Sequence, residues 1–330
     1  MKSILITGAS SGFGRGVSVE LAQRGWRVFA AMRDTGKSGS LIEAAEAGGV
    51  AERIEVVELD VTVPASVEAA VADVLARCGG TLDALLNNAG YSVLGAFEDL
   101  SDADCRQQME TNFFGVLAVT RAVLPSMRDA GHGRIVVVTS NAVNSPHPLL
   151  TMYAASKWAL EGWAEGLAME IAPYGVDLAL IQPGAHRTEF AGNVQFVSGT
   201  GGAYAQWIEG ALPGISNLDA WGRDPALAIG PIADAVTAPA VPFRQQLGED
   251  SKIFAMLKGN MPFETRALLL RAICGLPAPG AFTGGEAAGS ADYPVLSQVL
   301  AKFVGSAVKD AGLAETVARS FGIAPTTAGG

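Results

Sequence analysis

Tyr153 and Lys157 are two residues whose types and spacing suit proton transfer. They stand four residues apart at the start of a predicted helix, so their side chains share one face of it. A phenol has an unperturbed pKa near ~10, which must shift before the group exchanges protons at neutral pH. A neighbouring ammonium favours the phenolate and lowers that pKa. The pair therefore suits general acid–base chemistry, although the same spacing also arises by chance at an ordinary exposed helix start.

A glycine-rich segment near the N-terminus can hold phosphate. It is Thr7-Gly8-Ala9-Ser10-Ser11-Gly12-Phe13-Gly14, between the first predicted strand and the first predicted helix. Glycines let a backbone turn tightly and approach a pyrophosphate, and a helix N-terminus offers free N–H groups. The spacing is Gly-x-x-x-Gly-x-Gly, not the Gly-x-Gly-x-x-Gly of most dinucleotide folds. Such a loop can be a plain turn, but its position before an amphipathic helix predicts nucleotide binding.

Five motifs, taken in order, make the sequence resemble the short-chain dehydrogenase/reductase family. They are the glycine loop, Asn87-Asn88-Ala89-Gly90, Ser140, Tyr153-x-x-x-Lys157 and Pro183-Gly184. The resemblance covers about residues 1–250 and implies a nicotinamide-dependent oxidoreductase. The strand end Ala31-Met32-Arg33-Asp34 and the long C-terminal part look like the hydroxysteroid and retinol dehydrogenase-like branch.

The resemblance assigns catalytic roles to four residues. It implies that Tyr153 is the general acid/base and that Lys157 bonds the nicotinamide ribose. It further implies that Ser140 bonds the substrate oxygen and that Asn112 holds a water molecule in a proton relay. Ser140 also ends a predicted strand, and ligands of open α/β sheets lie beyond the carboxyl ends of strands. Either chain neighbour of Ser140 could be confused with it, and simple burial is the alternative for Asn112.

The resemblance also implies a cofactor site. Asn88 and Gly90 would line the adenosine side, Asp60-Val61 would contact adenine, and Thr188 would contact the phosphate or carboxamide. His186 replaces the usual aliphatic residue beside the nicotinamide, where its side chain either touches substrate or is a spare polar group. A helix or turn cap is the alternative for Asp60. The expected cofactor contacts are Gly8, Ser10, Ser11, Gly12, Phe13, Gly14, Arg33, Asp60, Val61, Asn88, Ala89, Gly90, Tyr153, Lys157, Pro183, Gly184, His186 and Thr188.

The end of the second predicted strand favours NADP(H) over NAD(H). An acid at this strand end would bond the adenosine ribose and select NAD, whereas an Arg suits a 2′-phosphate. Met32 stands at the position of the acid, and Arg33 follows it. Asp34 has roughly the distance from the glycine loop that an NAD-selecting acid would have, but it stands beyond the strand end. Arg15 adds positive charge just past the loop, or is merely solvated.

Alternating strands and helices must position these residues. They predict an α/β fold with a doubly wound parallel sheet, the Rossmann fold. We expect strands at 4–6, 27–32, 54–59, 82–86, 134–139, 177–181 and 243–247, and helices at 17–24, 67–77, 102–130, 153–172 and 224–238. One domain is expected over residues 1–250, with a substrate loop at 188–222. Residues 251–330 would form a helical C-terminal extension packed on the same domain.

Composition argues against several other classes. The net charge of −10 over 330 residues disfavours nonspecific binding to nucleic acid or to an anionic membrane surface. Three widely spaced cysteines predict reduced thiols rather than disulfides or a metal cluster. No apolar run reaches the ~20 residues of a membrane-spanning helix, and the sequence shows no signal peptide. We expect a cytoplasmic protein without a metal.

The sequence thus predicts hydride transfer between NADP(H) and a hydrophobic ketone or secondary alcohol. Carbonyl reduction is the expected direction, because cells keep NADPH reduced. One alternative is an acyl-carrier-protein ketoreductase, which the acidic surface and long C-terminal part disfavour. Another is a catalytically silent NADP-binding sensor or scaffold, which the presence of Ser140, Tyr153 and Lys157 disfavours. The resemblance also implies a homodimer or homotetramer through the helices 102–130 and 153–172.

Overall fold

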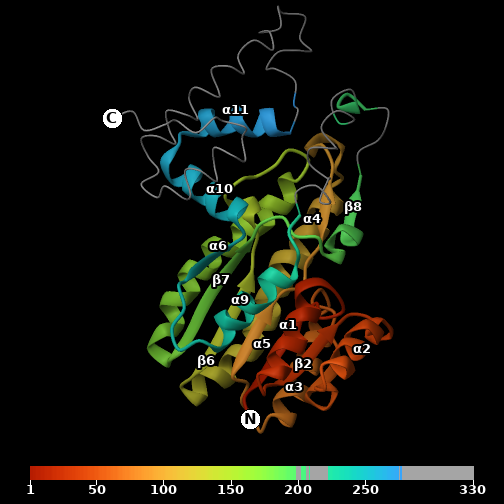
Figure 1. Ribbon diagram of the computed structural model, residues 1–330, viewed down its shortest axis with the longest axis vertical. Helices are drawn as coiled ribbons and strands as arrows, with labels where there is room; N and C mark the ends of the chain where they lie inside the picture. The colour runs from red at the N-terminus through yellow and green to blue at the C-terminus, as the bar shows by residue number, and fades with distance from the viewer. Residues whose placement is uncertain (198–201, 206–207, 209–221, 275, 277–330) are drawn as a thin grey trace, which may run out of the picture. The chain divides into compact units, whose positions relative to one another are not determined.

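The computed structural model describes residues 1–197, 202–205, 208, 222–274 and 276 (Figure 1). The chain divides into two compact units, one of residues 1–200 with 218–251 and one of 201–217 with 252–330. The first unit contains every residue of the predicted catalytic and cofactor sites. The expected packing of residues 251–330 on the same domain stays a prediction.

A seven-stranded sheet forms the centre of the first unit. Its strand order is β3-β2-β1-β4-β6-β7-β9, and every neighbouring pair is parallel. This order confirms the predicted doubly wound sheet, whose order reverses next to β1. The strands are β1 Ser3–Thr7, β2 Arg27–Met32, β3 Ile54–Glu58, β4 Ala84–Asn87, β6 Gly133–Val138, β7 Val176–Pro183 and β9 Arg244–Leu247.

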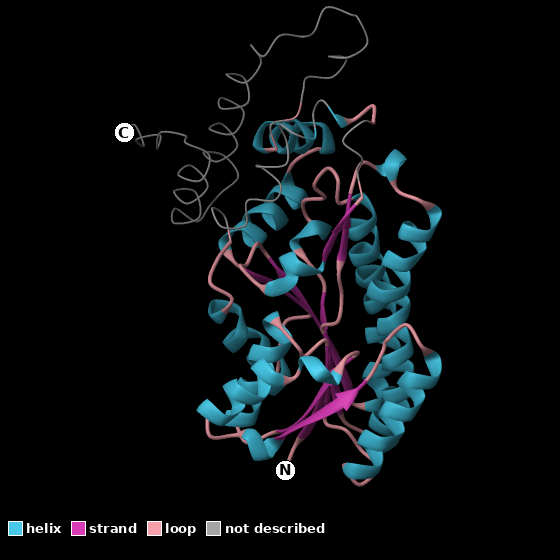
Figure 2. Ribbon diagram, turned by 90° about the vertical axis from the view of Figure 1, so that its right-hand side faces the viewer, coloured by secondary structure: helices cyan, strands magenta, loops and turns pink. Residues whose placement is uncertain are grey.

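Helices cover both faces of the sheet, as Figure 2 shows. One face carries α1 Gly12–Gln23, α2 Gly39–Ala47 and α9 Ala226–Thr237, and the other carries α3 Pro64–Arg77, α5 Gly115–Ala130 and α6 Thr151–Ile171. Successive side chains of a strand point to opposite faces, so Ile4 and Ile6 enter the first core and Leu5 enters the second. Full burial of such a side chain contributes about 1.5–3 kcal/mol. Both cores therefore require the continuous apolar strands seen in the sequence.

The predicted helix over 102–130 is interrupted. The structure has α4 Asp102–Met109, a π-helical turn at Glu110–Phe114 labelled η4, and then α5. A capping box starts α4, because Ser101 Oγ accepts from the Asp104 N–H at 3.1 Å and Asp104 accepts in return from the Ser101 backbone. Helical periodicity does not reveal a π turn, which adds one residue to a helix turn and often marks a functional site.

Two short strands were not predicted. β5 Ser92–Leu94 and β8 Val194–Phe196 pair in parallel as a separate sheet. β8 lies in the segment expected to be a substrate loop, which also contains a short helix at Glu189–Asn193. Trp207 and Trp221 of that loop lie outside the described residues.

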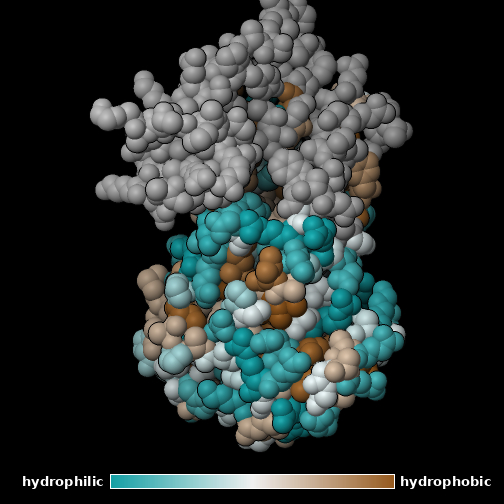
Figure 3. Space-filling view, in the orientation of Figure 1, coloured by the Kyte–Doolittle hydropathy of each residue, from teal (hydrophilic) through white to brown (hydrophobic). Residues whose placement is uncertain are grey.

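The remaining elements are short or belong partly to the second unit. Helices α10 Glu249–Asn260 and α11 Phe263–Ile273 follow β9, and α2 is a further helix that the sequence pattern did not predict. Short 3-10 turns lie at Thr35–Lys37, Ala51–Arg53, Phe97–Asp99, Asn141–Val143 and Ala172–Tyr174. On the face shown in Figure 3, hydrophilic side chains surround smaller apolar areas. No helix of the described residues is long and apolar enough to cross a membrane.

Candidate active site

Lys157 is a buried cation beside the end of β6. Helix α6 begins at Thr151, which places Tyr153 in its first turn and Lys157 one turn later on the face toward the sheet. Lys157 is 5% exposed, and its Nζ donates to the Val138 carbonyl at 2.9 Å. Burial disfavours the charged form and lowers the pKa of Lys157 to about 8. The amine therefore exchanges protons close to physiological pH.

Tyr153 faces both Lys157 and Ser140. The Lys157 Nζ lies 5.9 Å from the centroid of the Tyr153 ring. Burial raises the pKa of Tyr153, and a hydrogen bond with Ser140 acts in the opposite direction. The net direction differs from the expected lowering by an adjacent ammonium. The raised pKa holds the phenol in its protonated form, which is the form that can donate a proton.

Ser140 stands where β6 ends and a short turn begins. Its backbone is extended, with φ −172° and ψ 157°, and its Oγ accepts from the Ala142 N–H at 3.1 Å. This bond holds the side chain at the carboxyl edge of the sheet and leaves the hydroxyl proton available. The Ser140 hydroxyl thus lies close enough to Tyr153, thirteen residues later in the sequence, to lower the pKa of its phenol.

Asn112 lies inside the π turn and is fully buried. Its Oδ1 accepts from the Tyr91 N–H at 3.0 Å, and its Nδ2 donates to the Tyr91 carbonyl at 3.0 Å and to Ser156 Oγ at 3.1 Å. Ser156 Oγ in turn donates to the Tyr153 carbonyl at 2.7 Å. The structure thus links Asn112 to the helix turn that carries Tyr153, through a serine that the sequence motifs did not single out.

Gly90, in the loop that follows β4, lies beside Asn112 and Lys157. A Cβ atom on Gly90 would stand 3.2 Å from Asn112 Oδ1 and 3.7 Å from Lys157 Nζ. The four predicted catalytic residues and the loop after β4 therefore converge at the carboxyl edge of neighbouring strands. Open α/β sheets bind their ligands at this position.

The glycine loop is built for close backbone approach. Gly8 has φ +68°, and a Cβ atom there would stand 2.8 Å from Ala89 Cα. A Cβ atom on Gly14 would stand 2.3 Å from the Gly8 carbonyl oxygen. Asn88 Nδ2 donates to the carbonyls of Thr7 at 3.1 Å and Gly8 at 3.0 Å. Asn88 therefore fastens the loop to β4, which is a structural task beside its expected contact with adenosine.

The N-terminus of α1 already binds an anion, the carboxylate of Glu189. The Gly12 N–H donates to Glu189 Oε2 at 3.0 Å, and Arg15 pairs with Glu189 Oε1 at 2.6 Å. Desolvation raises the pKa of this carboxyl, but bonds from its own and the Gly12 backbone and from Arg15 outweigh it and lower the pKa overall. The loop residues therefore fit a phosphate group, since a side-chain oxyanion takes their hydrogen bonds in this structure.

The rest of the loop borders the N-terminus of α1. Ser11 precedes α1 as its N-cap, without a side-chain capping bond, and Ser10 is half-buried beside it. Phe13 packs its ring edge-on against His186, with ring centroids 5.2 Å apart.

Arg33 and its neighbours fit the expectation for a 2′-phosphate. Arg33 is exposed just beyond β2, and no ion pair engages it within the described part of the chain. Met32 is buried at 3% exposure, so the strand end offers no carboxylate. Asp34 Oδ1 accepts from the Gly36 N–H at 3.0 Å. The acid nearest to this strand end is therefore engaged in capping its own turn.

Asp60 and Val61 have local roles of their own. Asp60 Oδ1 accepts from the Thr62 N–H at 2.9 Å and from Thr62 Oγ1 at 2.7 Å, which is the turn cap considered from the sequence. Val61 packs against Gly115, where a Cβ atom would stand 2.8 Å from Val61 Cγ2. Contact of this pair with adenine stays a prediction.

The segment after β7 lies beside the glycine loop. Thr188 Cβ lies 3.5 Å from the position of a Cβ on Gly12. His186 is buried at 6% exposure, and its Nδ1 lies 2.9 Å from the Gly184 carbonyl oxygen. Its ring is thus held by Phe13 and Gly184, which accounts for its polar group without a substrate. Gly184, after Pro183, admits Asp250, whose Oδ2 accepts from the Ala185 N–H at 2.7 Å.

The segments around β5, Leu149 and β8 are joined by backbone hydrogen bonds. The Gly95 N–H donates to the Leu149 carbonyl at 2.9 Å, and the Val197 N–H donates to the Leu94 carbonyl at 3.0 Å. Leu149 has φ +66°, a backbone conformation that a branched residue rarely adopts and that is often found at functional sites. The Phe190 ring lies 5.9 Å from the Tyr153 ring. The wall beside the phenol is therefore apolar.

Comparison with known proteins identifies relatives. Residues 2–196 match the family model for short chain dehydrogenases. A 3-ketodihydrosphingosine reductase of Bacteroides thetaiotaomicron is 33% identical over 81% of this chain and 96% of its own. Human retinol dehydrogenase 8 is 38% identical over 58% of this chain and 61% of its own.

Solved structures are similar over most of the chain. A short-chain dehydrogenase from Streptomyces avermitilis is 35% identical, with a TM-score of 0.70 over 81% of this chain and 94% of its own. An alcohol dehydrogenase from Thermococcus sibiricus, complexed with 5-hydroxy-NADP, is 26% identical, with a TM-score of 0.61 over 75% of this chain and 96% of its own.

Proposed function

Because the chain belongs to the short-chain dehydrogenase/reductase family, we propose that it is an NADP(H)-dependent reductase of hydrophobic ketones. The observation that carries this proposal is the position of Tyr153 beside the Ser140 hydroxyl and 5.9 Å from the buried Lys157 Nζ. Proton donation to a substrate oxygen needs a protonated group within hydrogen-bond reach of that oxygen. Tyr153 is held protonated by burial, and Ser140 is its partner at the sheet edge.

The residues of this chain divide the work as follows. The bound cofactor supplies the hydride. Ser140 donates a hydrogen bond from its hydroxyl to the carbonyl oxygen and so positions it, and Tyr153 transfers its proton to that oxygen as it gains negative charge. Lys157 would hold the nicotinamide ribose and return a proton to the phenolate, since its own pKa of about 8 suits proton exchange near neutrality. Asn112 holds the chain segment behind this relay through Tyr91 and Ser156.

The cofactor site is best matched by NADP(H). The exposed Arg33, the buried Met32 and the self-capped Asp34 support a 2′-phosphate contact at the end of β2. The structural relative from Thermococcus sibiricus was solved with an NADP derivative, which is consistent with this choice. The diphosphate would take the backbone bonds of Gly12 that Glu189 takes in this structure.

A hydrophobic substrate follows from the residues around Tyr153. Phe190 places an apolar ring beside the phenol, and Leu149 and Val93 are buried apolar side chains of the neighbouring segments. The relative from Bacteroides thetaiotaomicron carries the name of a reductase of a 3-keto sphingoid base, which is a ketone on a long hydrocarbon chain. Ketones with long alkyl chains or fused rings are accordingly the first substrates to test.

A carbonyl and alcohol panel on the purified protein tests the proposal. Each ketone is offered with NADPH and with NADH, and each alcohol with the oxidised cofactors, while absorbance at the nicotinamide band is followed. We expect turnover of hydrophobic ketones that is faster with NADPH. A protein that binds NADPH but reduces no member of the panel would instead support a sensor or scaffold.

A further inference from the structure

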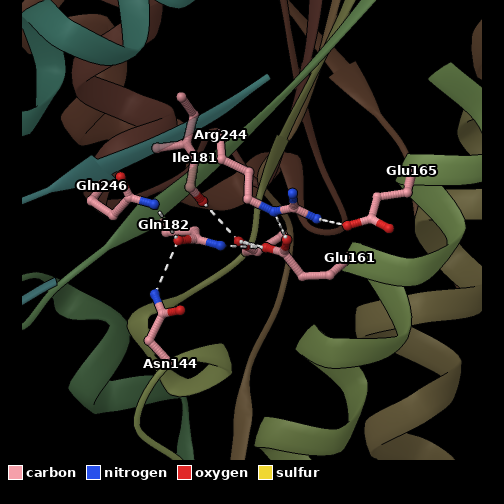
Figure 4. Close-up of polar contacts among 8 residues, drawn as sticks. Asn144, Glu161, Glu165, Ile181, Gln182, Arg244 and Gln246 are labelled. Atoms are coloured by element: carbon pink, nitrogen blue, oxygen red, sulfur yellow. Dashed lines mark hydrogen bonds and ion pairs between the residues drawn. The ribbon is translucent and has the colours of Figure 1, made fainter. Parts of the chain in front are cut away.

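Glu161 is a buried carboxylate on the catalytic helix that touches neither Tyr153 nor Lys157. It follows Lys157 by one turn of α6 and is 7% exposed. Its Oε1 accepts from Thr139 Oγ1 at 2.9 Å and from Gln182 Nε2 at 2.9 Å, and its Oε2 accepts from Arg244 Nε at 2.6 Å. One side chain thus joins α6 to β7, to β9 and to the residue that follows β6 (Figure 4).

The bonds of Glu161 enclose the segment that carries Ser140. Thr139 directly precedes Ser140, and its N–H also donates to the Ile181 carbonyl at 2.8 Å. On the other side, Asn144 Nδ2 donates to Gln182 Oε1 at 3.0 Å, and Gln182 is itself bound to Glu161. The chain on both sides of Ser140 is therefore tied to the helix that carries Tyr153.

A carboxylate is the group that this position needs. Every partner of Glu161 donates, so both oxygens must accept. In a glutamine at this position, an NH2 group would replace one of the two oxygens. That NH2 group would face a hydrogen-bond donor, so at least one of the present bonds would be lost. Buried networks of this kind are costly unless every member is satisfied, because charge in a low dielectric must be paired. Apolar packing would have closed this gap at less cost, which points to a task beyond stability.

We infer that Glu161 is a positioning residue, which holds Ser140 at hydrogen-bond distance from Tyr153 in the proton-transfer geometry. The inference rests on the proposed reductase function. Loss of the network should let the Ser140 segment shift and weaken its bond to Tyr153. Small misplacements of reacting groups lower turnover strongly while leaving distant binding contacts intact.

Glu165 provides a matched control on the same helix. It also pairs with Arg244, but its side chain is 56% exposed, and Thr139 and Gln182 are bonded to Glu161 instead. Glu165→Gln therefore perturbs Arg244 without touching the link to the Ser140 segment. Thr139→Val removes the hydroxyl that Glu161 holds, whereas Thr139→Ser keeps it.

The experiment measures kcat, KM, NADPH affinity and the pH profile of alcohol oxidation for these variants. Tyr153 must be deprotonated to act as the base in that direction, and it faces the Ser140 hydroxyl, the Lys157 ammonium and the Phe190 ring. Because Ser140 holds the phenol pKa down, a weaker bond should move the rise in rate to higher pH. We expect Glu161→Gln and Thr139→Val to move the rise in oxidation rate to higher pH. We also expect both variants to lower kcat between about tenfold and about a hundredfold, with NADPH affinity unchanged.

The outcomes separate this inference from the proposed function. Glu165→Gln and Thr139→Ser should keep the wild-type pH profile. An active wild-type protein whose Glu161→Gln and Thr139→Val variants keep that profile would overturn the positioning role alone. If Glu161→Gln does not fold, Thr139→Val decides by the same readout. A wild-type protein that fails to turn over any substrate would overturn both ideas.

Discussion

The Lys157 ammonium lies 5.9 Å from the centroid of the Tyr153 ring, and burial disfavours the charged form of both groups. Burial raises the pKa of the phenol and lowers that of the amine to about 8. An ion pair of phenolate and ammonium is therefore not the resting state of this site. The relay is better described as a protonated phenol beside a lysine whose pKa of about 8 allows proton exchange near neutrality.

Replacement of Lys157 by methionine should change the pH dependence of stability. Below pH about 8 both the folded and unfolded states hold the lysine proton, whereas between about 8 and the ordinary value of 10.5 the folded state releases it first. The unfolded state then binds more protons, so lysine becomes less costly as pH rises. The free energy of unfolding of wild type relative to Lys157→Met should rise by at most about 3 kcal/mol across this window. Urea unfolding at pH 7 and about pH 10.5 measures it, and a difference independent of pH would contradict the lowered pKa.

Arg33 should discriminate between the two cofactors. Replacement by alanine removes the exposed guanidinium beyond β2 that is proposed to hold the 2′-phosphate. NADPH affinity should fall between about tenfold and about a hundredfold, as for a lost bond to a charged group. NADH affinity should not change. Fluorescence titration measures both, with the exposed Arg128→Ala as a control on α5. Equal loss for the two cofactors would show that Arg33 does not select NADP.

Glu189 should weaken cofactor binding in the wild-type protein. Its carboxylate takes the bonds of Gly12 and Arg15 at the N-terminus of α1. Glu189→Gln removes the negative charge that competes with the diphosphate, so NADPH and NADH should both bind about two- to fivefold more tightly. The gain should shrink at high salt, because this pair is partly exposed. Titrations at low and high ionic strength check this, and weaker binding by the variant would mean that Glu189 supports the site.

Much of the fold follows from local patterns in the sequence. Buried strands such as β1 are short apolar runs next to turn residues, and the alternation of Ile4, Leu5 and Ile6 between two cores requires helices on both faces. The glycine loop and Tyr153-x-x-x-Lys157 could be placed because both depend on chain positions that lie close together.

Long-range features could not be predicted in this way. The pairing of β5 with β8 joins segments that are distant in sequence, and neither is long or apolar enough to stand out. The π turn around Asn112 breaks the helical period by a single residue. Gln108 is fully buried and donates to the Tyr91 carbonyl at 2.9 Å. It precedes Asn112 by four residues, and this pair of amide side chains at helical spacing is the one signal in the sequence that could have indicated a buried polar cluster here.

The partners of Glu161 show the same limit. Lys157 and Glu161 share a helix face at a spacing that usually indicates a solvent-exposed ion pair. In the structure Lys157 instead donates to the Val138 carbonyl, and Glu161 binds side chains from β7, from β9 and from the residue after β6. Only the folded sheet brings Thr139, Gln182 and Arg244 together.

The most direct test of the central claim compares the wild-type protein with Tyr153→Phe, using a ketone that the wild type reduces. The variant keeps the ring that contacts Phe190 and loses only the hydroxyl. It should bind NADPH as wild type does, while kcat for ketone reduction falls by at least about a hundredfold. If Tyr153→Phe binds NADPH and still reduces the ketone at the wild-type rate, Tyr153 is not the proton donor.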